Sequence, residues 1–339
     1  MRTHVIFFLL VSLLSRVVWS LEESSLPTTL QTQAIPYFQS AQTGVLKTPD
    51  HVQIRYRIFE PNVEPFKGNL VIISGRTGFM WRSAELLYDL RNSGYRIFIY
   101  DHRGQGESQR LLSDSHKGHV NDFNDYVKDL DQFLSEVVKP KSSEKTFLLA
   151  HSMGGAVATR FVIEHPDRVT ALVLTSPMYH ADTGMIPPTL AYYVLKFMVF
   201  IGQGEAYTFG RSADDWQHTF ENNDLTHSEN RHNFSKQLMR ENNALIVAGP
   251  THRWVREALG IGFWIESHAK DIKTPLLILQ SKDDTVVSPA AEAQVCVQSS
   301  VCNIVPFSGA KHDLLMEQDV YRNEAIKQAL GFYQRHSDR

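Results

Sequence analysis

The 339-residue sequence has only two cysteines, and neither stands in a Cys-X-X-Cys or Cys/His spacing that would bind a metal. It also lacks a long basic run, and its formal net charge is −3, so we expect no nucleic acid partner. A Gly-X-Gly-X-X-Gly fingerprint is missing, and so are internal repeats and low-complexity tracts. We therefore expect neither a metal nor a cofactor. A chain of this length can bury a core without a disulfide scaffold.

The N-terminus differs in composition from the rest of the chain. Arg2 precedes a strongly apolar stretch, Val5–Leu14, and Val18 and Ser20 are small enough for a cleavage site. This pattern predicts a signal peptide over residues 1–20 and export to the periplasm or the medium. The alternative is an uncleaved membrane anchor, although a bilayer span needs about 20 apolar residues. In an oxidising compartment we favour a disulfide between Cys296 and Cys302 over two free thiols.

After the signal peptide, the chain alternates short apolar strands with helical segments. This alternation is typical of βαβ units and predicts a mostly parallel central sheet with helices on both faces. Residues 178–250 break the rhythm and predict an inserted helical cap, so that the core comprises 49–177 and 251–339. Residues 21–48, polar with scattered proline, predict an extended N-terminal arm. The predicted strands cover 52–58, 70–73, 95–100, 146–150, 171–175, 276–280 and 302–307, and the predicted helices 81–92, 120–138, 154–165, 289–297 and 324–335.

The strongest chemical signal is the segment Ala150–Gly155, AHSMGG. It follows a predicted strand and opens a predicted helix, which is the context of a nucleophile elbow, a sharp turn that holds a serine hydroxyl clear of the sheet. The positions two residues before and after the serine must be small; Gly154 fits, and Ala150 stands where glycine is usual. The pattern predicts Ser152 as a nucleophile.

A serine nucleophile needs a histidine base and a carboxylate that orients the histidine. In this kind of fold the acid and then the histidine follow the serine along the chain. Asp283 and Asp284 follow the strand LLILQ, and His312 follows the last strand. We predict Asp284 and His312 as the partners of Ser152. The spacing to the following Val-Val pair favours Asp284 over Asp283, which we expect to cap the loop or face water.

The oxyanion of an acyl-transfer intermediate needs two backbone N–H donors. We predict that Met153, the residue after the nucleophile, supplies one of them. The other is assigned to Arg76, in the glycine-containing loop after the strand VIIS. The Arg76 side chain is open to two interpretations, a solvated group or a ligand for an anionic head group. The loop Asp101–Ser108 is interpreted as a scaffold near the pocket.

Together these residues resemble the lysophospholipase L2 family of α/β-hydrolases, related to monoacylglycerol lipases. The resemblance covers roughly residues 50–335 and rests on YDHRGQGES, GHVNDFNDYVKDLDQF, LLAHSMGG, GPTHRWVREAL and GAKHDLL. It implies an α/β-hydrolase fold and metal-independent hydrolysis of lysophospholipids to a fatty acid and a glycerophosphodiester. The cap shows weaker resemblance.

The segment Leu190–Ile201 is apolar on nearly every side. It is either a helix buried in the core or a lid that lines an acyl channel or touches a membrane. For the lid, we expect Tyr192, Tyr193, Phe197 and Phe200 to bind the acyl chain. The sequence thus favours a lipid-ester hydrolase with a peripheral membrane contact. The alternatives are a monoacylglycerol lipase, a hydrolase of other small esters, thioesters or peptides, and a non-catalytic binding protein.

Overall fold

The computed structural model of the protein describes residues 20–181 and 183–337. Its centre is an eight-stranded sheet with the order β1-β2-β4-β3-β5-β6-β7-β8. Strand β2 pairs antiparallel with β1 and β4, and all other neighbours pair in parallel. The strands are β1 (Gln42–Lys47), β2 (Gln53–Phe59), β3 (Gly68–Ile73), β4 (Tyr95–Tyr100), β5 (Thr146–His151), β6 (Ala171–Thr175), β7 (Leu276–Ser281) and β8 (Cys302–Phe307).

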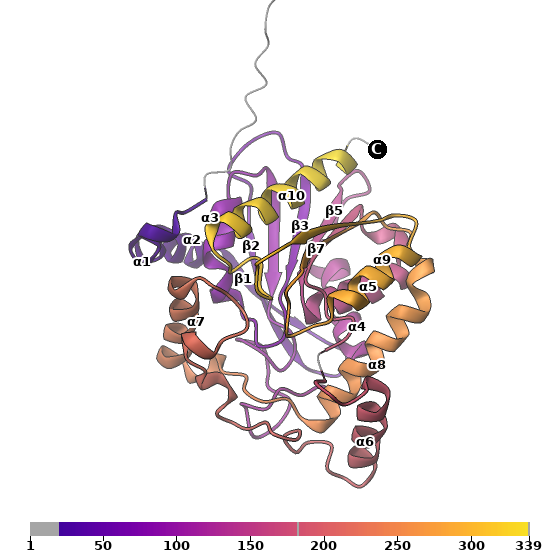
Figure 1. The fold of residues 1–339 in the computed structure, drawn as a ribbon. Coiled ribbons are helices and arrows are strands. Elements are labelled where there is room, and N and C mark those ends of the chain that lie inside the picture. Colours follow the sequence, from indigo (N-terminus) through magenta and orange to yellow (C-terminus); the bar gives the residue numbers. More distant parts are fainter. Residues whose placement is uncertain (1–19, 182, 338–339) are drawn as a thin grey trace, which may run out of the picture.

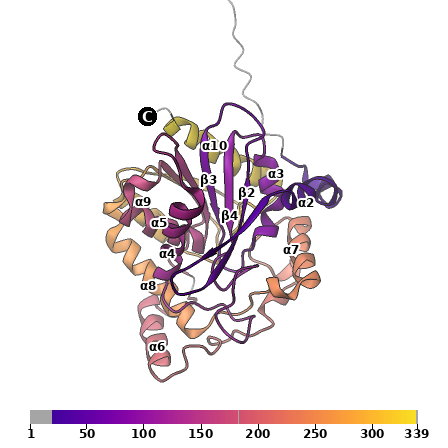
Figure 2. The same ribbon diagram turned by 180° about the vertical axis from the view of Figure 1, so that it is seen from behind.

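Helices cover both faces of this sheet (Figures 1 and 2). Side chains alternate between the faces: Leu70 and Ile72 of β3 pack in one apolar core with α3 and α10, while Val71 and Ile73 pack in another with α4 and α5. The predicted mostly parallel sheet with helices on both faces is therefore confirmed. The longer helices are α3 (Ala84–Leu90), α4 (Asn124–Phe133), α5 (Met153–Glu164), α6 (Pro188–Phe200), α7 (Glu229–Glu241), α8 (His252–His268), α9 (Pro289–Gln298) and α10 (Asp319–Ser337).

The extended arm predicted for residues 21–48 is wrong. Residues 23–39 are helical, including α1 (Leu26–Thr29) and α2 (Ile35–Gln39), and the strand β1 follows. Every fourth side chain from Leu26 to Phe38 is buried, as expected for one face of a helix. Pro27 lies in the first turn of α1, where a missing N–H costs little. Pro36 directly follows the π-helical turn Leu30–Ala34.

Between β6 and α8 the chain leaves the sheet and forms two separate helices. Helix α6 packs against α8, and α7 packs against a short helical turn, η3 (Met80–Ser83), that precedes α3. Both lie beyond the carboxyl ends of the parallel strands, α6 below α8 and α7 on the opposite side (Figure 1). The predicted cap boundaries, 178 and 250, stay a prediction.

Two further predictions concern the cysteine pair and the N-terminus. Cys296 in α9 and Cys302 in β8 form a disulfide, as favoured from the sequence. The predicted signal peptide lies outside the described residues except for Ser20. Within the described residues, none of the helices is both long enough and apolar enough to span a membrane.

Candidate active site

Ser152 lies at the sharp turn between β5 and α5, with the uncommon backbone angles φ 52° and ψ −117°. A Cβ atom at position 154 would lie 2.5 Å from the carbonyl oxygen of Ser74, so this turn requires Gly154. Ala150 is fully buried in the core, and its methyl group is therefore accommodated where glycine is usual. The strand–turn–helix geometry predicted for the segment is present.

The structure brings together the three side chains predicted from distant parts of the chain. The His312 ring lies with Nε2 2.9 Å from Oγ of Ser152 and Nδ1 2.6 Å from Oδ2 of Asp284. Because an ionised carboxylate can only accept a hydrogen bond, Nδ1 carries the proton and Nε2 is left as the acceptor for the serine hydroxyl. All three side chains are buried or nearly so. This arrangement can move a proton from Ser152 to His312.

The two neighbouring aspartates have different surroundings. Burial would raise the pKa of Asp284, but the hydrogen bonds from His312 and from the amides of Val286 and Val287 outweigh it and lower the pKa. Asp284 therefore stays ionised beside the histidine. Asp283 instead accepts a hydrogen bond from the amide of Gly309, 2.7 Å away. It holds the loop before His312, as expected for a loop cap.

The loop after β3 packs directly on the turn that holds Ser152. A Cβ atom at Gly75 would lie 3.1 Å from the Cβ of Ser152, a tight contact, so this loop approaches the Ser152 turn closely. Arg76, the next residue, is therefore beside the nucleophile. The amide of Met153 is the first of helix α5, where an N–H has no intrahelical acceptor. The positions of both residues fit the predicted pair of oxyanion donors.

The Arg76 side chain turns away from bulk solvent. Its guanidinium donates to the carbonyl oxygen of Ala248 and lies over the Trp254 ring, 5.2 Å from the centroid. Its Nε is buried without a hydrogen bond partner, and no carboxylate forms an ion pair with it in the described part of the chain. Burial lowers the pKa of Arg76 to about 10. The side chain is thus a partly buried cation held by Ala248 and Trp254, not a freely solvated arginine.

The loop Asp101–Ser108 holds the loop of Arg76 in place. His102 Nε2 lies 3.0 Å from the carbonyl oxygen of Ser74, and the Gln105 side-chain amide bonds Gly75 and Thr77 on both sides of Arg76. These contacts fit the scaffold role interpreted from the sequence.

A second polar network beside His312 was not predicted. The Asp313 carboxylate accepts from Arg82 at 2.7 Å and lies 3.6 Å from His151 Nε2. The rings of His151 and His312 are 4.8 Å apart, and His151 Nδ1 lies 3.0 Å from the hydroxyl of Thr175. Burial lowers the pKa of His151 to about 4, which leaves it neutral. The one sequence signal for this network was that His151 precedes Ser152 and Asp313 follows His312 directly.

The predicted acyl-binding residues lie on α6, away from Ser152. Leu195 is the one buried residue of this helix, so the interpretation as a core helix is wrong. Tyr192 packs against Phe263 of α8, with ring centroids 5.8 Å apart. Tyr193, Phe197 and Phe200 are 59%, 58% and 85% exposed. These three rings form an apolar outer face on α6.

An open cavity of about 800 Å³ lies between the start of α6 and the loop of Asp284. Met185, Ile186 and Phe263 give it an apolar side, and His180 and Asp284 a polar one. Its described lining includes none of the four α6 aromatics named above.

Three comparisons relate the chain to known proteins. The Hydrolase_4 family, described as serine aminopeptidase S33, matches residues 64–319. Lysophospholipase L2 of Escherichia coli K12 is 36% identical over 277 residues, which is 79% of this chain and 81% of that protein. A probable lysophospholipase L2 of Haemophilus influenzae is 30% identical over 304 residues, covering 88% and 94% of the two chains.

Among solved structures, a soluble variant of monoglyceride lipase from Saccharomyces cerevisiae superposes with a TM-score of 0.69 at 16% identity. The match covers 88% of this chain and 98% of that one. At this identity the likeness shows the fold alone, and it confirms the predicted α/β-hydrolase fold.

Proposed function

Because the chain belongs to the Hydrolase_4 family and to the lysophospholipase L2 group, we propose that it hydrolyses a lipid carboxylic ester, with a lysophospholipid as the preferred substrate. The observation that carries the proposal is the hydrogen-bonded series Ser152–His312–Asp284 at 2.9 and 2.6 Å. The products are a fatty acid and a glycerophosphodiester.

In the proposed reaction, Ser152 Oγ attacks the ester carbonyl carbon while His312 Nε2 takes the hydroxyl proton. The amides of Arg76 and Met153 donate hydrogen bonds to the oxyanion that forms. When the intermediate collapses, the acyl chain stays on Ser152, and His312 returns its proton to the leaving glycerol oxygen. Water, activated by the same histidine, then releases the fatty acid. Asp284 holds His312 in the required tautomer throughout.

The Arg76 side chain supports a preference for a phosphate-bearing lipid. A partly buried guanidinium that forms no ion pair with a carboxylate in the described residues can attract an anionic oxygen through its charge. Arg76 also lies in the loop that packs on Ser152, so a head group held there would place its glycerol ester close to the nucleophile. A monoacylglycerol has no charge for this group to recognise.

The outer face of α6 supports a peripheral membrane contact. Three aromatic rings and Leu190, itself 56% exposed, point outward together. Lys196 is the one charged residue of α6. A group of exposed apolar side chains of this kind marks a surface that contacts a membrane or another apolar partner. We assign Tyr193, Phe197 and Phe200 to this contact, with residues 178–250 as the cap, and Tyr192 to the junction with α8.

We also propose that the protein is exported to the periplasm or the medium after cleavage near Ser20. The N-terminal sequence pattern supports this, and so does the Cys296–Cys302 disulfide, because disulfides persist in oxidising compartments.

The test measures release of fatty acid from lysophospholipids, monoacylglycerols and short-chain esters, and of amine from aminoacyl anilides. Ser152→Ala is the control and should be inactive, while its thermal unfolding stays close to that of the parent. Highest kcat/KM on lysophospholipids supports the proposal. Equal activity on monoacylglycerols would favour a monoacylglycerol lipase, and cleavage of short esters or anilides alone would refute a lipid substrate. Absence of fluorophosphonate labelling at Ser152 would point to a non-catalytic protein.

A further inference from the structure

The first described segment of the chain enters a buried group of charged side chains. The amide nitrogen of Leu21 lies 3.0 Å from Oδ1 of Asp89, and the Leu21 side chain is 9% exposed. Two residues later, the amide of Glu23 donates to Asp319 at 2.8 Å. The start of the described chain is therefore fixed against α3 and α10.

This charged group has fewer cations than anions. Arg231 of α7 and Arg322 of α10 are fully buried. They form ion pairs with Glu23 ahead of α1, with Glu85 and Asp89 of α3, and with Asp319 of α10. Two guanidinium groups thus face four carboxylates. Asp89 itself is 1% exposed. Burial raises its pKa, with Arg322 opposing and Glu85 adding to the rise.

The end of the predicted signal peptide falls at this contact. We propose that the mature protein begins at Leu21, and that its α-ammonium group forms a buried ion pair with Asp89. Water cleaves the Ser20–Leu21 peptide bond on an exporting peptidase, which leaves the carboxylate on Ser20 and the ammonium on Leu21. The inference rests on the proposed export but not on the proposed reaction.

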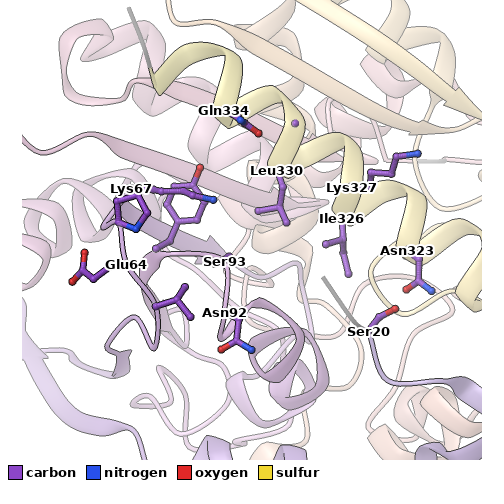
Figure 3. Close-up of a pocket in the computed structure, with 14 residues that line it drawn as sticks. Ser20, Glu64, Lys67, Asn92, Ser93, Asn323, Ile326, Lys327, Leu330 and Gln334 are labelled. Atoms are coloured by element: carbon purple, nitrogen blue, oxygen red, sulfur yellow. The ribbon is translucent and has the colours of Figure 1, made fainter. Parts of the chain in front are cut away.

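A cavity with polar side chains adjoins Ser20, the residue before Leu21. Ser20 borders a cavity of about 790 Å³ between α10 and the segments around Val63 and Asn92. Figure 3 shows Ser20 at the edge of this cavity, at the side where α10 presents Asn323. Oδ1 of Asn323 and Oγ of Ser93 line the same cavity and are buried without hydrogen bond partners. An amide has one hydrogen for Asp89, whereas an ammonium group has three hydrogens and a positive charge.

The order of cleavage and folding explains how the peptidase reaches the Ser20–Leu21 bond. Leu21 is buried once the protein is folded, so cleavage takes place on the unfolded chain during export, and folding then docks the new terminus. A chain that keeps residue 20 makes only the neutral amide contact, and Asp89 then has the ion pair with Arg322, 2.7 Å away, without the second positive charge. The processed chain should therefore be the more stable one.

The experiment compares three full-length mature chains: one with a free Leu21 amine, one with N-acetyl-Leu21, and one that begins at Ser20. At pH 7 we expect the free Leu21 chain to unfold about 4 °C above the other two. In an Asp89→Asn background the three should unfold together. Equal unfolding temperatures with Asp89 present, or an advantage that persists in Asp89→Asn, would overturn the inference.

The pH dependence gives a second readout. An α-amino group in an unfolded chain has a pKa of about 8, and pairing with Asp89 raises it in the folded chain. The advantage of the free Leu21 chain should thus be complete below about pH 8 and disappear as the pH rises through the raised value. If Asp89→Asn does not fold, the pH dependence of acetylation of the native α-amine replaces it; an unshifted amine would overturn the pairing.

N-terminal sequencing of protein recovered from the exporting cell tests the cleavage itself, and any terminus other than Leu21 overturns it. The unfolding temperatures, their pH dependence and the N-terminal sequence are all independent of Ser152. If the lipid-ester proposal fails, these results are therefore unaffected. If the N-terminal ion pair fails, the lipid-ester proposal is likewise unaffected.

Discussion

Replacing Asp284 by asparagine should nearly abolish turnover, because the substitution reverses the tautomer of His312. Oδ1 of Asp284 accepts from the amides of Val286 and Val287 at 2.7 and 3.1 Å. In Asp284→Asn these two amides hold the side-chain oxygen in the same place. The new NH₂ group must then point at His312 Nδ1, which lies 2.6 Å from Oδ2 of the native residue.

A donor at that position forces Nδ1 to accept, so the ring proton moves to Nε2. Nε2 lies 2.9 Å from Ser152 Oγ and can no longer take the serine proton. Loss of the correct tautomer costs about 10⁴-fold in kcat in the serine protease that defines this effect, equivalent to about 5.5 kcal/mol of activation free energy. We expect a loss of the same order for this protein.

The assay follows hydrolysis of a soluble ester and the rate of fluorophosphonate labelling of Ser152. Asp283→Asn is the matched control, since Asp283 bonds the amide of Gly309 and not the histidine. It should keep at least about a tenth of the activity, because the asparagine oxygen can still accept from the amide of Gly309 and only the negative charge at this contact is lost, at a cost of about 1 kcal/mol. If the two variants lose activity equally, or if Asp283→Asn loses more, the assignment of Asp284 as the orienting acid is refuted.

Three further changes test other parts of the structure. Gly154→Ala places a methyl group 2.5 Å from a carbonyl oxygen and should destabilise the fold by about 2 kcal/mol, measured by urea unfolding; an unchanged midpoint would contradict the turn geometry. The double variant Phe197→Ser and Phe200→Ser should lower activity on lysophospholipid vesicles about tenfold and leave soluble-ester turnover unchanged. Val320 is another exposed apolar residue, and Val320→Ser should alter neither activity. A loss of activity on both substrates in the double variant would argue against the membrane contact. Burial raises the pKa of Asp101 to about 7, above about 3.9 in an unfolded chain. Stability should therefore fall from about pH 4 to pH 7, because the unfolded chain releases this proton in that range while the folded chain still holds it. Asp101→Asn should flatten this part of the unfolding-temperature profile, and an unaltered slope would count against it.

The parallel strands and the candidate triad could be predicted because their signals are local. Strand β4 was placed at its observed bounds, Tyr95–Tyr100, since a buried strand between turns is a continuous apolar run. Strand β1 was missed because it lies at the sheet edge and buries only Leu46. The helices of residues 23–39 were missed because Pro27, in a first helical turn, and Pro36, after a π-helical turn, were both interpreted as signs of an extended chain.

Contacts between residues far apart in the chain could not be read from the sequence. Arg82 pairs with Asp313, 231 positions away, and no periodicity signals such a pair. The orientation of α6 was open for a related reason: a helix that is apolar all round has the same sequence whether it is buried or faces a membrane. Only its packing against α8 on one side decides which rings are exposed.

The pairing of Asp313 with Arg82 bears on the charge that His312 gains during the reaction. Two carboxylates, Asp284 and Asp313, lie near the ring, and both have a lowered pKa despite burial. Only Asp284 accepts from the ring itself. The charge of Asp313 is balanced by Arg82 at 2.7 Å, so Asp313 is held away from Nδ1 and does not compete for it. His151 is kept neutral by burial and adds no opposing charge at 4.8 Å from the His312 ring. The electrostatic environment therefore leaves one carboxylate to stabilise the imidazolium and to select its tautomer.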